Sequence, residues 1–434
     1  LFIENNENSF IKEKYRGNAV KFFYKRISLD LMHMYPRPLY LEQLLRFKDS
    51  PVVKVITGMR RCGKSALLEL YRDALLNSGV PPERIFSFNF ESLANADLLD
   101  YMALYKRVMA NAGETKEKVY LLFDEIQEVE GWQKAVNAFR VDLNADITIT
   151  GSNARLLSGE LATLIAGRYV EIRVWPLSFA EFLLFNGLKT ESCDLLKAFD
   201  AFVRQGGLPG LHQIGGGMEA RMQYLGDIFD AVLLKDVVQR NNVRDVELLS
   251  RIIMFLMDNI GSPFSAKTVS DFLKSQGRKL STETVYNYLR FLERAFIVEK
   301  AKRFDLKGKK LLETQEKIFV CDTGIRNAVV GFRPDDIAGL LENIVYLHLR
   351  QKGYDVTIGK LDALEVDFVA RKRDVQIYIQ VCYLLTDENR ARELAPLQKI
   401  KDNYPKFLLT MSPMAEGSID GIMVKDFIKF LLDF

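Results

Sequence analysis

Eight consecutive residues around position 60 have the types and spacing of a loop that binds phosphate groups. They match the pattern G-x-x-x-x-G-K-[ST] in full and follow an apolar β-branched run. Glycines let the backbone turn its N–H groups toward a phosphate, the lysine carries a positive charge to the β- and γ-phosphates, and the serine hydroxyl is a ligand for Mg²⁺. We therefore expect a nucleotide to be bound by Gly58, Met59, Arg60, Arg61, Cys62, Gly63, Lys64 and Ser65.

Two acidic residues end a second apolar segment, Tyr120-Leu-Leu-Phe-Asp124-Glu125. Asp124 at the end of a buried strand is suited to hold Mg²⁺ together with Ser65, and Glu125 to orient and deprotonate an attacking water. Two acids at the end of a strand could also simply face solvent. Their occurrence together with the phosphate loop in one chain favours the catalytic interpretation. The two segments together predict hydrolysis of a phosphoanhydride bond, with Glu125 and Lys64 as catalytic residues.

Small polar residues follow another expected strand in Ile147-Thr-Ile-Thr150-Gly-Ser152-Asn153. Ligands bind at the carboxyl ends of strands in an open parallel sheet, so Ser152 or Asn153 is placed to sense the γ-phosphate or the attacking water. Both residue types are also good helix caps, and the two interpretations are equally consistent with the pattern.

Arg168, in Ala166-Gly-Arg168-Tyr, is a further candidate for catalysis. A guanidinium can stabilise the charge of a phosphoryl-transfer transition state. An ordinary surface arginine fits the sequence equally well, and the sequence does not say whether Arg168 would act in its own chain or in a second copy.

The elements that must position these residues alternate between strand and helix patterns. Such alternation is typical of a parallel sheet with helices on both faces. Expected strands are 52–57, 85–90, 119–123, 146–150 and 169–174, and expected helices are 65–76, 98–110 and 132–141.

Composition places the chain among ordinary globular proteins. It has 434 residues, 48% hydrophobic and 27% charged, with a net charge of +3. These values exclude a mainly disordered chain and a disulfide scaffold, and the length predicts about three domains. The four cysteines and three histidines are scattered, and no apolar run is long enough to span a bilayer. A reduced, cytoplasmic setting without a zinc site fits this pattern best.

Residues from about 248 to 322 have the pattern of a winged helix. Helices are expected at 249–259, 267–275 and 282–295, followed by a hairpin of strands near 297–304 and 317–321. The third helix offers Thr284, Asn287, Arg290 and Arg294 to DNA, and the hairpin carries basic residues at Lys300, Lys302, Arg303, Lys307, Lys309 and Lys310. Such a basic patch can bind the phosphate backbone of DNA. Alternatively, the winged helix is used only for packing or for contact with a protein.

The motifs together resemble those of a known family. GMRRCGKS, YLLFDE, ITGSN and AGRYVEIRVWPLSFAEF are similar to segments of AAA-type P-loop ATPases, in particular the archaeal and bacterial group with a C-terminal domain of unknown function. The resemblance covers nearly all the chain after Met34. It implies ATP rather than GTP as the nucleotide, and the chain has no N/T-K-x-D motif that would read a guanine base.

The last part of the chain resembles a restriction-endonuclease-like fold. A helix there carries Glu342, a strand carries Glu365-Val-Asp367, and the next strand contains Gln380 and Cys382. Active nucleases of that fold have an acid and a lysine where this chain has Gln380 and Cys382. A neutral amide is a poor Mg²⁺ ligand and a thiol cannot replace an ammonium, so we expect no nuclease activity.

These observations predict an α/β P-loop NTPase domain followed by a winged-helix region and a small α/β domain. The expected division is an N-terminal extension at 1–35, an ATPase domain at 36–180, a helical linker or lid at 181–247, a winged helix at 248–335 and a restriction-endonuclease-like domain at 336–434. We expect Mg²⁺-dependent ATP binding and hydrolysis coupled to C-terminal domains that bind DNA or a protein. The alternative is an ATP-dependent binding switch with negligible turnover.

Overall fold

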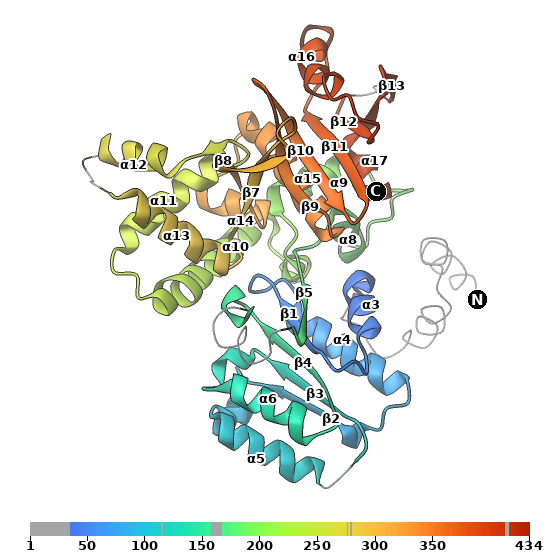
Figure 1. Cartoon of the computed structure of the whole chain (residues 1–434), viewed down its shortest axis with the longest axis vertical. Coiled ribbons are helices and arrows are strands. Elements are labelled where there is room, and N and C mark those ends of the chain that lie inside the picture. The colour runs from blue at the N-terminus through green and yellow to red at the C-terminus, as the bar shows by residue number, and fades with distance from the viewer. Residues whose placement is uncertain (1–34, 114–115, 158–166, 276, 278–279, 413–415) are drawn as a thin grey trace. The chain divides into compact units, whose positions relative to one another are not determined.

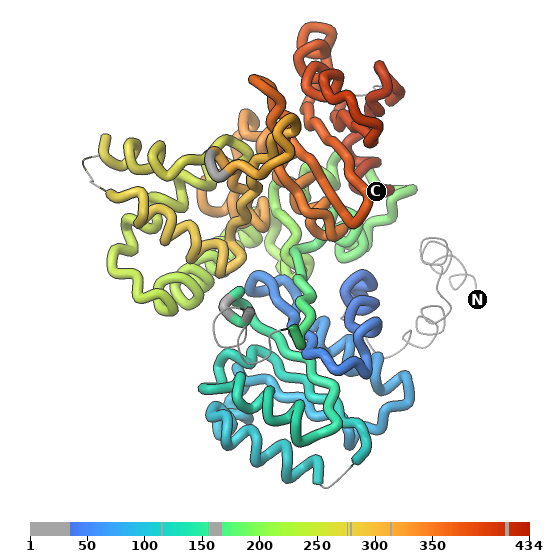
Figure 2. Tube along the Cα trace, in the orientation of Figure 1, coloured from blue at the N-terminus to red at the C-terminus, as the bar shows by residue number. Residues whose placement is uncertain are grey.

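The computed structural model describes residues 35–434 apart from 114–115, 158–166, 276, 278–279 and 413–415. Residues 1–34 of the expected N-terminal extension lie outside the described residues. The described residues divide into two compact units: an N-terminal unit that includes those of 35–56, 64–151 and 167–172, and a C-terminal unit that includes those of 57–63, 152–157 and 173–434. Figures 1 and 2 show the chain coloured along its length.

A five-stranded parallel sheet forms the centre of the first part of the chain, in the order β2-β3-β4-β1-β5 (Figure 1). Its strands confirm the expected ones and are β1 (Val53–Thr57), β2 (Ile85–Asn89), β3 (Val119–Asp124), β4 (Ala145–Gly151) and β5 (Tyr169–Arg173). All residues of β1 and β3 are buried, as expected for strands covered on both faces.

The helices that cover this sheet are α3 (Pro38–Arg46), α4 (Lys64–Asn77), α5 (Tyr101–Ala112) and α6 (Trp132–Asp142). The connection from β1 to β2 runs one way along the sheet, and those from β2 to β3 and from β3 to β4 run the other way. Right-handed crossovers therefore place α4 on one face and α5 and α6 on the other. Parallel strands also bring the carboxyl ends of β1, β3 and β4 to one edge of the sheet.

A buried ion pair joins two strands of this sheet at the opposite edge. Lys54 of β1 donates to Asp146 of β4, and both side chains are completely buried. Asp146 also accepts the backbone N–H of Asp49. The pair satisfies two charges that would be costly to bury alone, so it helps to fix β1 beside β4.

Helices dominate the chain from 179 to 294. They are α8 (Phe179–Phe185), α9 (Leu195–Gln205), α10 (Gly217–Val232), α11 (Val246–Asp258), α12 (Ala266–Ser275) and α13 (Thr282–Arg294), with a π-helical turn at Leu233–Gln239. This confirms the helical character expected for 181–247 and the three helices expected after residue 248. Among the described residues, no helix is both long and apolar enough to cross a lipid bilayer.

A mixed nine-stranded sheet holds the rest of the C-terminal unit together. It comprises β6 (Pro263–Phe264), β7 (Val298–Asp305), β8 (Lys310–Val320), β9 (Asp355–Leu361), β10 (Leu364–Lys372), β11 (Val375–Cys382), β12 (Lys406–Thr410), β13 (Gly417–Ile419) and β14 (Ile422–Asp426). The β7–β8 hairpin confirms the expected pair of strands, but β7 also pairs with β9 in parallel. The expected boundary at 335/336 therefore runs through one continuous sheet.

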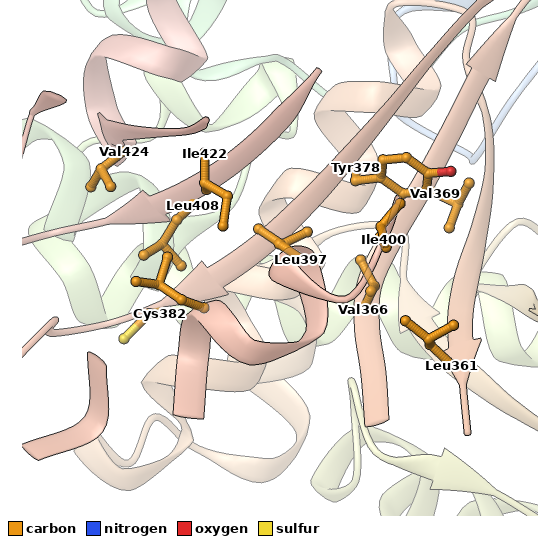
Figure 3. Packing of buried hydrophobic residues seen from close by; sticks show 11 residues of the cluster. Leu361, Val366, Val369, Tyr378, Cys382, Leu397, Ile400, Leu408, Ile422 and Val424 are labelled. Carbon is orange, nitrogen blue, oxygen red and sulfur yellow. The ribbon is translucent and has the colours of Figure 1, made fainter. Parts of the chain in front are cut away.

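Helices α14 (Thr323–Val330), α15 (Ile337–Gln351), α16 (Asp387–Gln398) and α17 (Phe427–Asp433) complete this unit. Helix α15 packs against strands β8 to β11, and α16 packs against β10, β11, β12 and β14. The side chains between α16 and the sheet form an apolar core that includes Val366, Cys382, Leu397 and Leu408 (Figure 3).

Gly206 and Gly207, which follow α9, form a tightly packed turn. A Cβ on Gly207 would lie 2.4 Å from the Leu177 carbonyl oxygen, and one on Gly206 would lie 2.1 Å from Asp322 Oδ1. Asp322 accepts the Gly207 N–H at 2.7 Å and caps α14 through the Ile325 N–H at 3.0 Å. A buried carboxylate thus ties the end of α9 to the start of α14.

Burial raises the pKa of Asp322 to about 6, although three backbone N–H groups act to lower it. Because the folded protein binds this proton more tightly than the unfolded chain, stability is greatest below the unfolded pKa and falls as the pH rises toward 6. The expected loss is about 3 kcal/mol between pH 3.8, the ordinary pKa of an aspartate, and pH 6. Urea denaturation from about pH 4 to about pH 7 measures it, and Asp322→Asn should remove this slope. Parallel curves for the two proteins would contradict the assignment.

Candidate functional site

The phosphate loop connects β1 to α4 and has the backbone of a tight anion-binding turn. Gly58, Arg61 and Gly63 have φ angles of 144°, 68° and 97°. A Cβ at position 58 would lie 2.2 Å from the carbonyl oxygen of Val174, so only glycine fits there. The backbone of the predicted phosphate loop therefore requires glycine at positions 58 and 63.

The loop is embedded in side chains of the C-terminal unit. The Cys62 thiol donates to the Val174 carbonyl at 3.4 Å, and the side chain of Pro209 approaches Gly63. Arg60 Nε donates to Asp236 Oδ2 at 3.3 Å, and Arg240 Nε lies 3.3 Å from Asp236 Oδ1. Asp236 is 1% exposed and belongs to the π-helical turn. Sequence reasoning missed Asp236, because nothing in its local sequence links it to a loop 176 residues upstream.

Lys64 and Ser65 begin α4, and both face the end of β3. Lys64 Nζ lies 3.6 Å from Glu125 Oε1, with both side chains buried. The Ser65 hydroxyl hydrogen-bonds to Asp124. The edge of the sheet thus brings together the residues expected to hold the metal ion (Ser65 and Asp124), to contact the phosphates (Lys64) and to activate water (Glu125).

Thr150, at the end of β4, organises the two carboxylates. Its hydroxyl donates to Asp124 Oδ1 at 2.6 Å and accepts the Glu125 backbone N–H at 2.9 Å. The polar residues expected at this strand end were Ser152 and Asn153, and Thr150 was not among them. The available signal was a polar residue on a buried strand next to the acidic strand, in the register that parallel pairing imposes.

Glu125 has a strained backbone. Its φ of 53° lies in the left-handed region that a side chain rarely adopts, at a cost of about 1–3 kcal/mol. The Thr150 hydroxyl bond to its N–H holds this conformation, and Gln127 donates to Glu125 Oε2. Such strain is often stored at sites that need a fixed side-chain direction.

Asp124 is suited to a cation. It is 6% exposed, and burial raises its pKa, while hydrogen bonds from Thr150 and Ser65 oppose that shift. A divalent ion beside it would favour the ionised carboxylate, and carboxylate and hydroxyl oxygens are the hard ligands that Mg²⁺ prefers. The residues present therefore fit the Mg²⁺ predicted for Ser65 and Asp124.

The two remaining candidates have different surroundings. Asn153 is buried (1% exposed), and its carbonyl accepts the Leu156 N–H at 3.1 Å. Arg168 is exposed, and its carbonyl accepts the Val53 N–H at the start of β1. Because Lys64 follows the other end of β1, the structure does not bring Arg168 to Asp124 and Glu125. A transition-state role for Arg168 within its own chain is therefore not supported.

The basic hairpin of the C-terminal unit carries less free charge than its sequence suggests. Lys300 pairs with Glu293 and Glu316, Arg303 with Glu365, and Lys307 with Asp362. Lys302, Lys309 and Lys310 are exposed. The positive surface available to a partner is thus smaller than the predicted patch.

Comparisons with known proteins agree with this architecture. The family described as AAA domain matches residues 50–183, and a domain of unknown function (DUF8612) matches residues 196–336. A protein of Haemophilus influenzae named "Uncharacterized protein" is 42% identical over 399 residues, covering 92% of this chain and 99% of that protein.

A further relative and a solved structure to which the chain is similar both come from archaea. "Uncharacterized protein MJ1544" of Methanocaldococcus jannaschii is 30% identical, covering 88% of this chain and 86% of that protein. The solved structure of the Walker-type ATPase paby2304 of Pyrococcus abyssi is 15% identical with a TM-score of 0.47, covering 68% of this chain and 96% of that one. The chain therefore belongs to the bacterial and archaeal family of AAA-type P-loop proteins in which a domain of unknown function follows the AAA domain.

Proposed function

We propose that this protein binds ATP with Mg²⁺ and hydrolyses it, and that the nucleotide state acts on its C-terminal unit. The observation that supports this most strongly is that Lys64 and Ser65 contact Glu125 and Asp124, two acids that the Thr150 hydroxyl holds together. The family and the absence of a guanine-reading motif favour ATP as the nucleotide. The cytoplasmic setting expected from the scattered cysteines stays a prediction.

Each residue has a separate role in this proposal. The loop amides of 58–63 and the Lys64 ammonium bind the phosphates, and Ser65 and Asp124 hold Mg²⁺. The metal ion, when bound, neutralises charge on the phosphate oxygens. Glu125, fixed by Thr150 and Gln127, orients a water and accepts its proton. Asn153 and Arg168 are secondary candidates, with Arg168 restricted to action on a second copy.

A binding switch with negligible turnover is the second candidate. The Lys64–Glu125 ion pair supports it, because a carboxylate that stays paired with an ammonium is a weaker base. The two candidates differ in one measurable quantity, the rate of phosphate release at saturating ATP and Mg²⁺.

Substitutions at Lys64 and Glu125 separate binding from turnover. Lys64→Ala should abolish nucleotide binding, because it removes the charge that faces the β- and γ-phosphates. Glu125→Gln should retain binding and lower kcat by about 10²–10³-fold, as expected for loss of a general base. Filter binding of labelled ATP and phosphate release measure the two effects.

The exposed Glu130 supplies the matched control, and Glu130→Gln should leave both quantities unchanged. An unchanged phosphate-release rate in Glu125→Gln would remove Glu125 from the mechanism. Rapid wild-type turnover would exclude the switch without turnover.

Asp236 tests whether the C-terminal unit shapes the phosphate loop. Asp236→Asn removes the charge that holds Arg60 and Arg240, so ATP should bind about 10- to 150-fold more weakly, as expected for a lost charged hydrogen bond. Arg60→Ala should add little in the Asp236→Asn background, because the two residues act as one pair. Asp230→Asn, an exposed change on α10, is the control. Equal ATP affinity in wild type and Asp236→Asn would show that the pair does not support the loop.

DNA is one of the two partner classes that we propose for the three helices and the hairpin, the other being a protein, and its binding can be tested by salt dependence. Affinity for duplex DNA should fall linearly with salt on logarithmic axes, and replacing Lys302 and Lys309 together by alanine should reduce the slope by about 2. Lys429→Ala, an exposed lysine of α17, should leave the slope unchanged. Titrations with and without ATP give the nucleotide dependence. A flat salt response in the wild type would discard the hairpin as a phosphate-binding surface.

A further inference from the structure

A second cluster of charged side chains lies inside the C-terminal unit. Lys317 of β8 is 3% exposed, and its Nζ lies 3.0 Å from Glu342 Oε2 of α15 and 2.9 Å from Glu365 Oε1 of β10. Asp367 Oδ1 of β10 lies 3.9 Å from the same nitrogen. One ammonium is thus surrounded by three carboxylates that come from two different elements.

These carboxylates include the residues that the resemblance to restriction-endonuclease-like folds assigns to a metal ion. Glu342 and Asp367 lie on the expected helix and strand, and Gln380 lies on the adjacent strand β11. The Lys317 ammonium, however, already lies between these carboxylates, at the position where a metal ion shared by them would neutralise their charge. A divalent ion bound to the same oxygens would lie within a few ångströms of this fixed positive charge, which opposes its binding.

Strand β11 also lacks the acid and the lysine that a metal-dependent nuclease site needs, because Gln380 and Cys382 stand at those positions. The Gln380 side chain is a neutral amide and supplies no negative charge. Its oxygen accepts the Asp367 N–H. Cys382 is buried in the apolar core beside α16, where burial raises its pKa to about 11 (Figure 3).

The charges of the cluster are balanced without a metal. Burial alone would lower the pKa of Lys317, but the attraction of Glu342, Asp367 and Glu365 outweighs it and raises the pKa. Arg303 Nη2 lies 3.5 Å from Glu365 Oε2 and adds a second positive charge. Burial raises the pKa of both Glu342 and Asp367. Two side-chain cations, Lys317 and Arg303, therefore lie within ion-pair distance of the three carboxyl groups.

We propose that the Lys317 ammonium is a built-in cation that replaces the divalent metal ion of a nuclease-like site. The cluster then clamps β8 to α15 and β10, and so ties the hairpin that was expected to be a free wing to the C-terminal strands. In this protein the nuclease-like fold serves as a rigid binding or coupling module, and it has no hydrolytic centre.

Manganese binding to the full-length, nucleotide-free protein tests this proposal, with Mn²⁺ counted by electron paramagnetic resonance. Lys317→Ala should bind about one more Mn²⁺ per chain than the wild type, and its melting temperature should rise with added Mn²⁺. Adding Asp367→Asn should remove this extra site, and Lys317→Arg, which keeps the cation, should not create it. Lys300→Ala is the matched control, because that lysine pairs with carboxylates outside the cluster.

Two results would overturn the proposal. A folded Lys317→Ala protein that binds no additional Mn²⁺ would show that the carboxylates do not form a latent cation site. Wild-type protein that binds Mn²⁺ in a manner lost with Asp367→Asn, or that cleaves plasmid DNA until Asp367 is replaced, would show that the site is metal-dependent after all. If Lys317→Ala does not fold, this wild-type comparison decides the question alone.

Discussion

A carboxylate buried at the end of a parallel strand must be given hydrogen bonds or a cation, and this constraint governs the site at Asp124. The Thr150 and Ser65 hydroxyls both bond to it, and each comes from an element that the sheet places beside β3. The same threonine holds the N–H of Glu125 in a strained conformation, so the direction of the proposed base follows from the same interaction. The arrangement leaves a metal ion as the natural further partner of Asp124.

The parts of this site that local chemistry dictates were predictable from the sequence. Glycines at 58 and 63, the lysine and serine after them, and two acids after an apolar strand form a pattern whose spacing has a physical reason. The parts that depend on strand order were not. Thr150 acts because β4 lies next to β3, and Asp236 acts because a helical turn far along the chain meets Arg60. No local signal marks Asp236, and the polar Thr150 on a buried strand gains meaning only once that strand is known to lie beside β3.

The C-terminal half shows the same division more strongly. Individual helices and strands followed from their apolar spacing, because burial on one face imposes a period that can be read directly. The pairing of β7 with β9 joins segments far apart in the sequence, so the hairpin expected to be a separate wing is part of a nine-stranded sheet. Basic residues read as a free surface, Arg303 and Lys300 among them, proved to be paired with acids that only the fold brings near. The number of basic residues in the sequence of the hairpin thus overstates the positive charge that is available to a binding partner.

Isothermal titration of ATP into the folded wild-type protein, with and without Mg²⁺, tests the central claim most directly. We predict saturable heat at about one ATP per chain, with clearly tighter binding when Mg²⁺ is present. Absence of binding heat under both conditions, in protein whose folding is verified by circular dichroism, would contradict it.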